Sequence, residues 1–154
     1  MKDWNVVVTV SDREGYSHAR RRLRLLGPIE ATDFHNVLVM RVPETGALLA
    51  ALAEMTRDDM SLYNDVSRLV PAQVTFDFGT KDEFESKARA TILGWADRLA
   101  GATFHIRLNR RGLGDLLNSP AQEKLLDDAL LARLAETERP GRITFSDPDC
   151  VIDI

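Results

Sequence analysis

The chain has 154 residues, of which 44% are hydrophobic and 29% charged, so it carries enough apolar material for one core or two small ones and is not a disordered protein. A single cysteine excludes an internal disulfide framework, and no apolar run approaches the ~20 residues of a membrane span, so a cytoplasmic location is expected. The net charge of −4, from 20 basic and 24 acidic side chains, excludes a globally basic nucleic-acid-binding protein but permits a local basic patch.

The first half of the chain alternates between strand-like and helix-like patterns. Strands are predicted over residues 4–10, 29–33, 37–42 and 67–78, helices over 14–26 and 44–57, and a loop over 58–65. Val6, Val8 and Val10 fall on one face of the first strand, and Ser11 with Glu14 predicts a capping box for the first helix. The order strand, helix, strand, strand, helix, strand is ferredoxin-like, and it predicts two helices over one face of a four-stranded antiparallel sheet.

The second half predicts two longer helices and three strands. A helix is expected over residues 80–100, opened by a capping box of Thr80 and Glu83, and a second over 120–138, with Ser119 as N-cap and Gln122 completing its capping box. The strands are expected over residues 103–109, 142–145 and 150–154. No linker rich in Pro, Gly or Ser separates the halves, so the predicted boundary near residue 79 is short.

A basic cluster follows the strand over residues 103–109. Phe104, Ile106 and Leu108 fall on its core face, and the opposite face is expected to be available for contact. The candidate binding residues on that face and in the following turn are His105, Arg107, Asn109, Arg110, Arg111 and Gly112. Arginine side chains in such a position can form bidentate hydrogen bonds with phosphate or stack on an unpaired base. The structural alternative is a surface ion network with Asp115, Asp127 or Asp128.

A second group of arginines lies on the first predicted helix. Arg20, Arg21, Arg22 and Arg24 fan across its solvent side at 100° per residue, which fits either a solvated helix face or an RNA contact made by Arg20, Arg21 and Arg24.

Candidate catalytic groups are few. His18, His35 and His105 are scattered, no His, Cys, Asp or Glu residues show metal-ligand spacing, and Gly112 and Gly114 do not form a phosphate-binding loop. Cys150 opens a buried strand, which favours a core residue over a nucleophile, and Asp147 and Asp149 flank Pro148 as turn formers. The sequence therefore predicts no enzyme, metal or cofactor, against the alternative of a small hydrolase using Asp147, Asp149 and His105.

The order of these features resembles the THUMP domain, an RNA-binding module of tRNA-modifying systems. The resemblance runs from about Asp82 to the C-terminus and rests on the aromatic-led strand, the R-R-G turn, the Ser-capped helix and the ending ITFSDPDCVIDI. It implies an α+β protein with a ferredoxin-like domain over residues 1–79 and a THUMP domain over 80–154. A further strand usually follows the last one in this family, so the resemblance implies a THUMP domain that is either C-terminally incomplete or unusually short at its C-terminus.

This pairing is similar to the RNA-binding part of tRNA 4-thiouridine synthetases and of THUMP-containing tRNA methyltransferases, and to the adaptor of tRNA acetylation. The resemblance implies a non-catalytic adaptor that binds the acceptor-stem region of tRNA and presents it to a separate modification enzyme. The motif matches carry this role to Phe104, Arg107, Arg110, Arg111 and Gly112, and charge alone extends it to Arg20, Arg21 and Arg24. The alternative is a ferredoxin-like ligand- or protein-interaction module without RNA binding, which the overall acidity favours.

Overall fold

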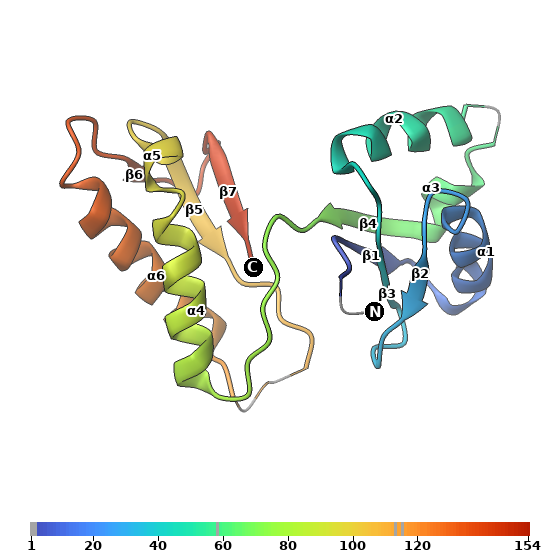
Figure 1. Cartoon of the computed structure of the whole chain (residues 1–154), viewed down its shortest axis with the longest axis horizontal. Helices are drawn as coiled ribbons and strands as arrows, with labels where there is room; N and C mark the ends of the chain where they lie inside the picture. Colours follow the sequence, from blue (N-terminus) through green and yellow to red (C-terminus); the bar gives the residue numbers. More distant parts are fainter. Residues whose placement is uncertain (1–2, 58, 113, 115) are drawn as a thin grey trace. The chain divides into compact units, whose positions relative to one another are not determined.

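The first half of the chain forms a four-stranded antiparallel sheet with helices packed on it (Figure 1). The computed structural model describes residues 3–57, 59–112, 114 and 116–154. The elements of this half are β1 (Val6–Val10), α1 (Arg13–Leu23), β2 (Ile29–Ala31), β3 (Val37–Met40), α2 (Thr45–Met55), α3 (Ser61–Asp65) and β4 (Val66–Pro71). The strands lie in the order β2-β3-β1-β4, and every neighbouring pair is antiparallel, which confirms the predicted sheet.

The alternation in β1 sets the core of this half. Val6, Val8 and Val10 are buried, and they share a core with Leu23 of α1 and Leu48 of α2. Fully burying one such side chain stabilises the fold by about 1.5–3 kcal/mol, and β-branched residues suit the pleated surface of a strand. The core face predicted for the first strand is therefore confirmed.

Three local predictions in this half are wrong. The N-cap of α1 is Asp12, whose Oδ1 accepts a hydrogen bond of 2.8 Å from the backbone N–H of Gly15, and not Ser11. The predicted loop contains α3, which is held to α1 by contact between His18 Nδ1 and Asp65 Oδ2. The last strand, β4, ends at Pro71 because its pairing partner β1 begins at Val6, leaving later residues without a strand to pair with.

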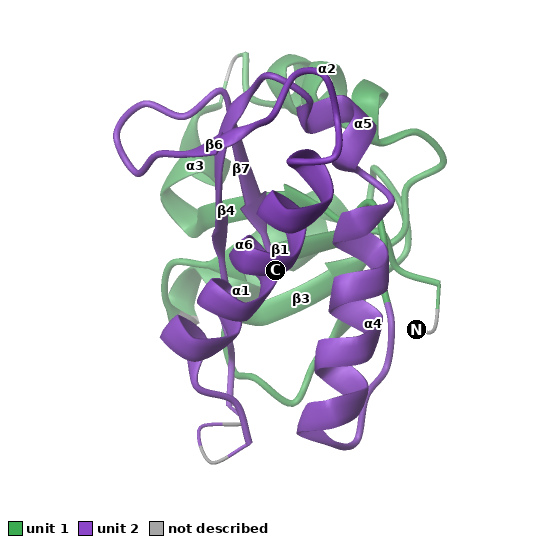
Figure 2. Cartoon of the chain, turned by 90° about the vertical axis from the view of Figure 1, so that its left-hand side faces the viewer, with its two compact units in different colours: residues 1–75 green, residues 76–154 purple. Residues whose placement is uncertain are grey.

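The chain forms two compact units, and the boundary between them falls between Thr75 and Phe76 (Figure 2). The ring centroids of Phe76 and Phe78 lie 6.2 and 5.1 Å from that of Phe84, so both rings join the core of the second unit. The predicted boundary at residue 79 lies four residues further along the chain.

The second unit is a three-stranded parallel sheet with two long helices on one face. Its elements are α4 (Lys81–Leu93), α5 (Ala96–Leu99), β5 (Thr103–Arg107), α6 (Ser119–Leu134), β6 (Arg142–Ile143) and β7 (Cys150–Asp153). The strand order is β6-β5-β7, and α6 supplies the crossover that parallel strands require. Figure 1 shows α4 and α6 side by side against β5 and β7. Together with the first unit, this arrangement confirms the predicted α+β class.

The helix ends in this unit follow their caps. Thr80 is the N-cap of α4, as predicted, and its hydroxyl accepts a 3.2 Å hydrogen bond from the N–H of Glu83. The predicted helix over 80–100 is broken near Gly94 into α4 and α5. The N-cap of α6 is Asn118, and Gln122 is buried, with its Nε2 donating to Glu85 Oε1 at 2.9 Å, so the predicted capping box of Ser119 and Gln122 is wrong.

The cap of α6 gives a direct test of this assignment. The Oδ1 atom of Asn118 accepts a 3.1 Å hydrogen bond from the N–H of Ala121. We expect Asn118→Ala to lower the free energy of unfolding by about 1 kcal/mol, because that N–H loses its partner, and Ser119→Ala to change it by only a few tenths. Urea unfolding of both variants measures the difference, and a larger loss in Ser119→Ala would contradict the assignment.

Candidate nucleic-acid interface

The strand that carries the predicted arginine cluster has one face in the core and a second face that is only partly open. Phe104 and Ile106 share the core with residues of α4 and α6, and Arg107 is exposed. The alternation predicted for this strand is confirmed. His105, however, is only 8% exposed, so the prediction that its side chain is available for contact is wrong.

The chain after β6 explains the burial of His105. Thr144 follows β6 directly, and its carbonyl oxygen lies 3.1 Å from His105 Nδ1. The ring of Phe145 lies 5.3 Å from the imidazole, centroid to centroid. A carbonyl partner fixes Nδ1 as the protonated nitrogen of the imidazole. His105 therefore supports the 144–145 segment and is not part of an open surface.

Arg107 and Asn109 meet at one acidic residue of the neighbouring strand. Asn109 Nδ2 donates to Asp153 Oδ1 at 3.0 Å, and Arg107 Nε lies 3.8 Å from the same oxygen. The backbone N–H of Asn109 also donates to the carbonyl of Ile154 at 2.8 Å. These contacts fix the end of β5 against β7 and leave about half of the Arg107 side chain exposed, available to a ligand.

Two of the acidic residues considered above as ion-pair partners of these arginines have other partners in the structure. Asp127 accepts a hydrogen bond from the N–H of Ile106, and Asp128 pairs with Lys124 at 2.9 Å, so neither serves the arginine cluster in the described contacts. Asp115 lies outside the described residues.

The two neighbouring arginines in the turn after β5, Arg110 and Arg111, have different contacts. Arg110 Nη1 donates to the carbonyl of Gly114 at 3.1 Å and to that of Leu117. Its guanidinium group therefore links the start of the turn to backbone carbonyls further along it. Arg111 is exposed, and within the described part of the chain its guanidinium has no hydrogen bond or ion pair. Gly112 has a φ of +69°, in the left-handed region that favours glycine. Arg111 and Arg107 are thus the arginines of this cluster that remain open to a ligand.

Acidic side chains of α6 complete the edge of β5 beside this turn. Because β6 ends at Ile143, opposite Phe104, the later N–H groups of β5 on that side lack a strand partner. Asp127 Oδ1 accepts from Ile106 N at 3.3 Å, and Glu123 Oε1 accepts from Leu108 N at 2.7 Å. Burial raises the pKa of the Asp127 carboxyl above its usual range, because the charged form is poorly solvated there.

Because the pKa of Asp127 is raised, the free energy of unfolding should depend on pH, and the direction of that dependence can be predicted. A carboxyl group whose folded-state pKa is raised contributes stability below its unfolded pKa of about 3.9, and that contribution is lost as the pH rises through the folded value. Asp127→Asn cannot titrate. We therefore expect the free energy of unfolding of the wild type to fall relative to Asp127→Asn between pH 4 and pH 7. Urea unfolding at several pH values measures this, and a constant difference would contradict it.

The arginines of α1 fall into two groups in the structure. Arg22 turns towards the chain after α2, where its guanidinium contacts Asp59 and Nη2 donates to the carbonyl of Met55 at 2.9 Å. Arg20, Arg21 and Arg24 instead line one small hollow of about 290 Å³ together with Tyr16 and Ser17. Of the four arginines predicted on the solvent side of this helix, Arg22 therefore has a structural contact, and the other three share one surface.

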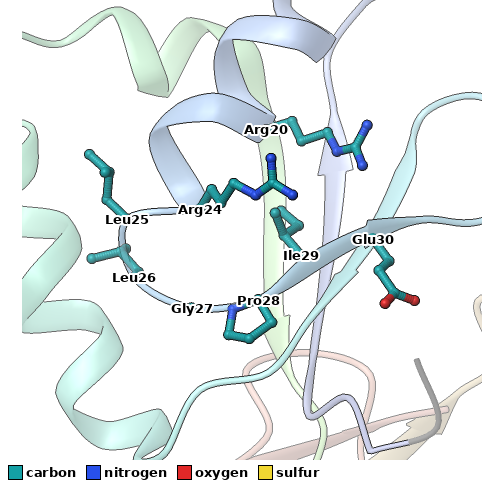
Figure 3. Close-up of a pocket in the computed structure, with 8 residues that line it drawn as sticks. All are labelled: Arg20, Arg24, Leu25, Leu26, Gly27, Pro28, Ile29 and Glu30. Atoms are coloured by element: carbon teal, nitrogen blue, oxygen red, sulfur yellow. The ribbon is translucent and has the colours of Figure 1, made fainter.

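A larger neighbouring hollow shares two of these arginines (Figure 3). It measures about 580 Å³ and is lined by Arg20, Arg24 and the segment from Leu25 to Glu30. Figure 3 shows the side chains of Arg20 and Arg24 extended in the same direction, with the guanidinium group of Arg24 close to Ile29 in this view. The Nε atom of Arg20 is buried and has no hydrogen-bond partner among the described residues. Tyr16 and Ser17, which no sequence pattern marked as binding residues, line the smaller hollow because they lie one helical turn before Arg20 and Arg21.

The remaining candidate groups have structural contacts. Asp149 accepts hydrogen bonds from the N–H and the hydroxyl of Thr103, at 2.8 and 2.7 Å, and these bonds lower the pKa of its carboxyl. Asp147 has a φ of +50°, typical of a turn, and Cys150 is partly buried against the core. In residues 3–57, 59–112, 114 and 116–154, no three His, Cys, Asp or Glu side chains are grouped to hold a metal ion. No helix among the described residues combines the length and apolar character needed to cross a bilayer.

Comparison with known proteins shows that the fold of this chain is similar to that of two solved structures. No protein-family model and no curated protein sequence matches the chain. The structure of PH1313 from Pyrococcus horikoshii OT3 superposes with a TM-score of 0.59 at 12% identity, over 99% of this chain and 50% of that one. A 4-thiouridine synthetase solved in complex with RNA and bound ATP gives a TM-score of 0.60 at 10% identity, over 98% of this chain and 38% of the synthetase chain.

The chain thus spans half or less of the length of these two structures. At such low identities the likeness concerns the fold. The resemblance to 4-thiouridine synthetases predicted from the sequence is confirmed at that level, and it supports a THUMP-like fold.

Proposed function

We propose that this chain is a non-catalytic RNA-binding protein that holds the acceptor-stem region of tRNA and presents it to a separate modification enzyme in the cytoplasm. The observation that carries the proposal is the likeness in fold, over 98% of the chain, to a synthetase solved with RNA. In this proposal residues 1–79 form a ferredoxin-like domain and residues 80–154 a THUMP domain. The antiparallel strand order β2-β3-β1-β4 supports the first assignment.

The placement of the arginines supports RNA as the ligand despite the net charge of −4. Arg20, Arg21 and Arg24 gather on one surface of the first unit, and Arg107 and Arg111 are exposed at the end of β5 in the second. Contacts to phosphate dominate the affinity of proteins for nucleic acids, and they require local clusters of positive charge more than a positive total charge. In the proposal these two arginine groups contact the RNA backbone, and Asn109, Arg110 and Gly112 shape the turn that presents Arg111.

A salt series with tRNA tests the proposal. We expect saturable binding by the wild type and a weaker salt dependence for Arg111→Ala. Each lost phosphate contact lowers the slope of log affinity against log salt by about 0.7–0.9, because fewer counterions are released. Arg111 is preferred to Arg110 for this experiment because the guanidinium of Arg110 holds the turn together.

Arg89→Ala is the matched control, since Arg89 is an exposed arginine on α4, outside both arginine groups. Its slope should equal that of the wild type. If the wild type shows no saturable binding even at low salt, RNA binding by this chain is wrong, and the ligand- or protein-interaction module favoured by the overall acidity takes its place.

A further inference from the structure

We propose that the arginine-lined hollow at the end of α1 is a phosphate-monoester site, and that its ligand is the 5′-terminal phosphate of an RNA strand. The site is the smaller hollow, lined by Tyr16, Ser17, Arg20, Arg21 and Arg24, and it shares Arg20 and Arg24 with the larger hollow. The choice of RNA as the source of the phosphate rests on the proposed function, whereas the site itself rests on its charge and shape.

The charge of the hollow is concentrated and uncompensated. In the described part of the chain, the guanidinium groups of Arg20, Arg21 and Arg24 have no hydrogen-bond or ion-pair partner, unlike that of Arg22. Three positive charges within little more than one helical turn repel one another, so a bound anion relieves that repulsion. The negative end of the helix dipole amounts to only about −0.5 charge, too little to offset three arginines.

The net charge fits a monoester better than a phosphodiester. Among the described residues, three arginines and no acidic side chain line the smaller hollow, which gives it a net charge of +3. A phosphate monoester carries about −1.5 to −2 at neutral pH, whereas a phosphodiester within a strand carries about −1. The terminal phosphate of a strand therefore matches the hollow more closely than an internal one.

The residues that line the two hollows also suit the terminal nucleotide of an RNA strand. Leu26, Pro28 and Ile29 are among the residues that line the larger hollow, and Tyr16 lines the smaller one. The larger hollow measures about 580 Å³, within the usual 300–1,000 Å³ of small-ligand sites, and it shares Arg20 and Arg24 with the smaller hollow. An aromatic side chain next to arginines allows the terminal base to stack while its phosphate is held.

The test compares two acceptor-stem hairpins of identical sequence, one with a 5′-phosphate and one with a 5′-hydroxyl. We expect the wild type to bind the phosphorylated hairpin about tenfold more tightly, because charged hydrogen bonds to the terminal phosphate are lost in the other. Arg24→Ala, at an exposed position, should abolish this preference. Arg111→Ala should weaken binding of both hairpins equally and keep the preference.

The outcomes separate this inference from the proposed function. Equal affinities for the two hairpins would leave RNA binding intact and overturn the 5′-end assignment. If neither hairpin binds, the proposed function fails, and titration with adenosine monophosphate, with adenosine as control, then tests the site itself. Binding of the monophosphate alone, lost in Arg24→Ala, would support a monoester site for a free nucleotide, and no binding would overturn the site.

Discussion

Arg21→Glu/Arg24→Glu should bind tRNA at least about 100-fold more weakly than the wild type at low salt, a loss of about 2.7 kcal/mol of binding free energy. The variant removes two unpaired arginines from the hollow and places two negative charges there, so attraction to phosphate becomes repulsion. Both side chains are exposed, so the fold should tolerate the change. Fluorescence anisotropy with labelled tRNA at 50 mM salt measures the loss.

The control for this variant carries the same change in total charge. Arg89→Glu/Arg98→Glu also reverses two exposed arginines and lowers the net charge from −4 to −8. These residues lie on α4 and α5, outside both arginine groups, so we expect a loss of only a few fold. Equal losses in the two variants would mean that total charge, and not the α1 surface, governs binding.

Phe104→Ala should destabilise the protein by about 3–5 kcal/mol, the usual cost of removing a buried aromatic side chain. Phe104 is fully buried at the centre of the second core, where it faces residues of α4 and α6. Such a loss is a large fraction of the 5–15 kcal/mol that typically stabilises a protein. Urea unfolding followed by circular dichroism measures it.

Phe145→Ala provides the comparison within the same unit. The Phe145 side chain is 78% exposed, with its ring centroid 5.3 Å from that of His105, so its removal should cost less than about 1 kcal/mol. If the two phenylalanine variants were equally destabilised, the burial assigned to β5 would be wrong.

The faces of the strands could be predicted from the sequence because they depend on local alternation. Val6, Val8 and Val10 in β1, and Phe104 and Ile106 in β5, repeat with the period of two that a half-buried strand requires. The pattern states which side of β5 His105 occupies, but not whether another segment covers that side. The covering segment, Thr144 and Phe145, lies some 40 residues later in the chain, so local alternation carries no sign of it.

The helix caps show a second limit of local patterns. Ser11 and Asp12, and likewise Asn118 and Ser119, are adjacent residues that can both cap a helix, so a shift of one residue leaves the pattern equally good. The structure selects Asp12 and Asn118. Helix boundaries are therefore less certain from sequence than the existence of the helices.

The roles of the arginines depended most on distant parts of the chain. Helical periodicity places Arg20, Arg21, Arg22 and Arg24 together on the solvent side of α1, but the partner that removes Arg22 from this group, Asp59, is 37 residues away. Similarly, Arg110 and Arg111 are adjacent in sequence, yet only Arg110 reaches the carbonyls that close its turn. Residue type predicted the candidate surface, and tertiary contacts decided which side chains remain available.

The most direct test of RNA binding at these two surfaces is an NMR titration of the ¹⁵N-labelled chain with an acceptor-stem hairpin carrying a 5′-phosphate. We expect saturable shifts of amide signals in two regions, residues 16–24 in and directly after α1 and residues 107–112 from the end of β5 into the following turn. The amide signals of α4, which carries Arg89, should change little. Saturable binding with shifts confined to other residues, or no shifts at all, would contradict RNA binding at these two surfaces.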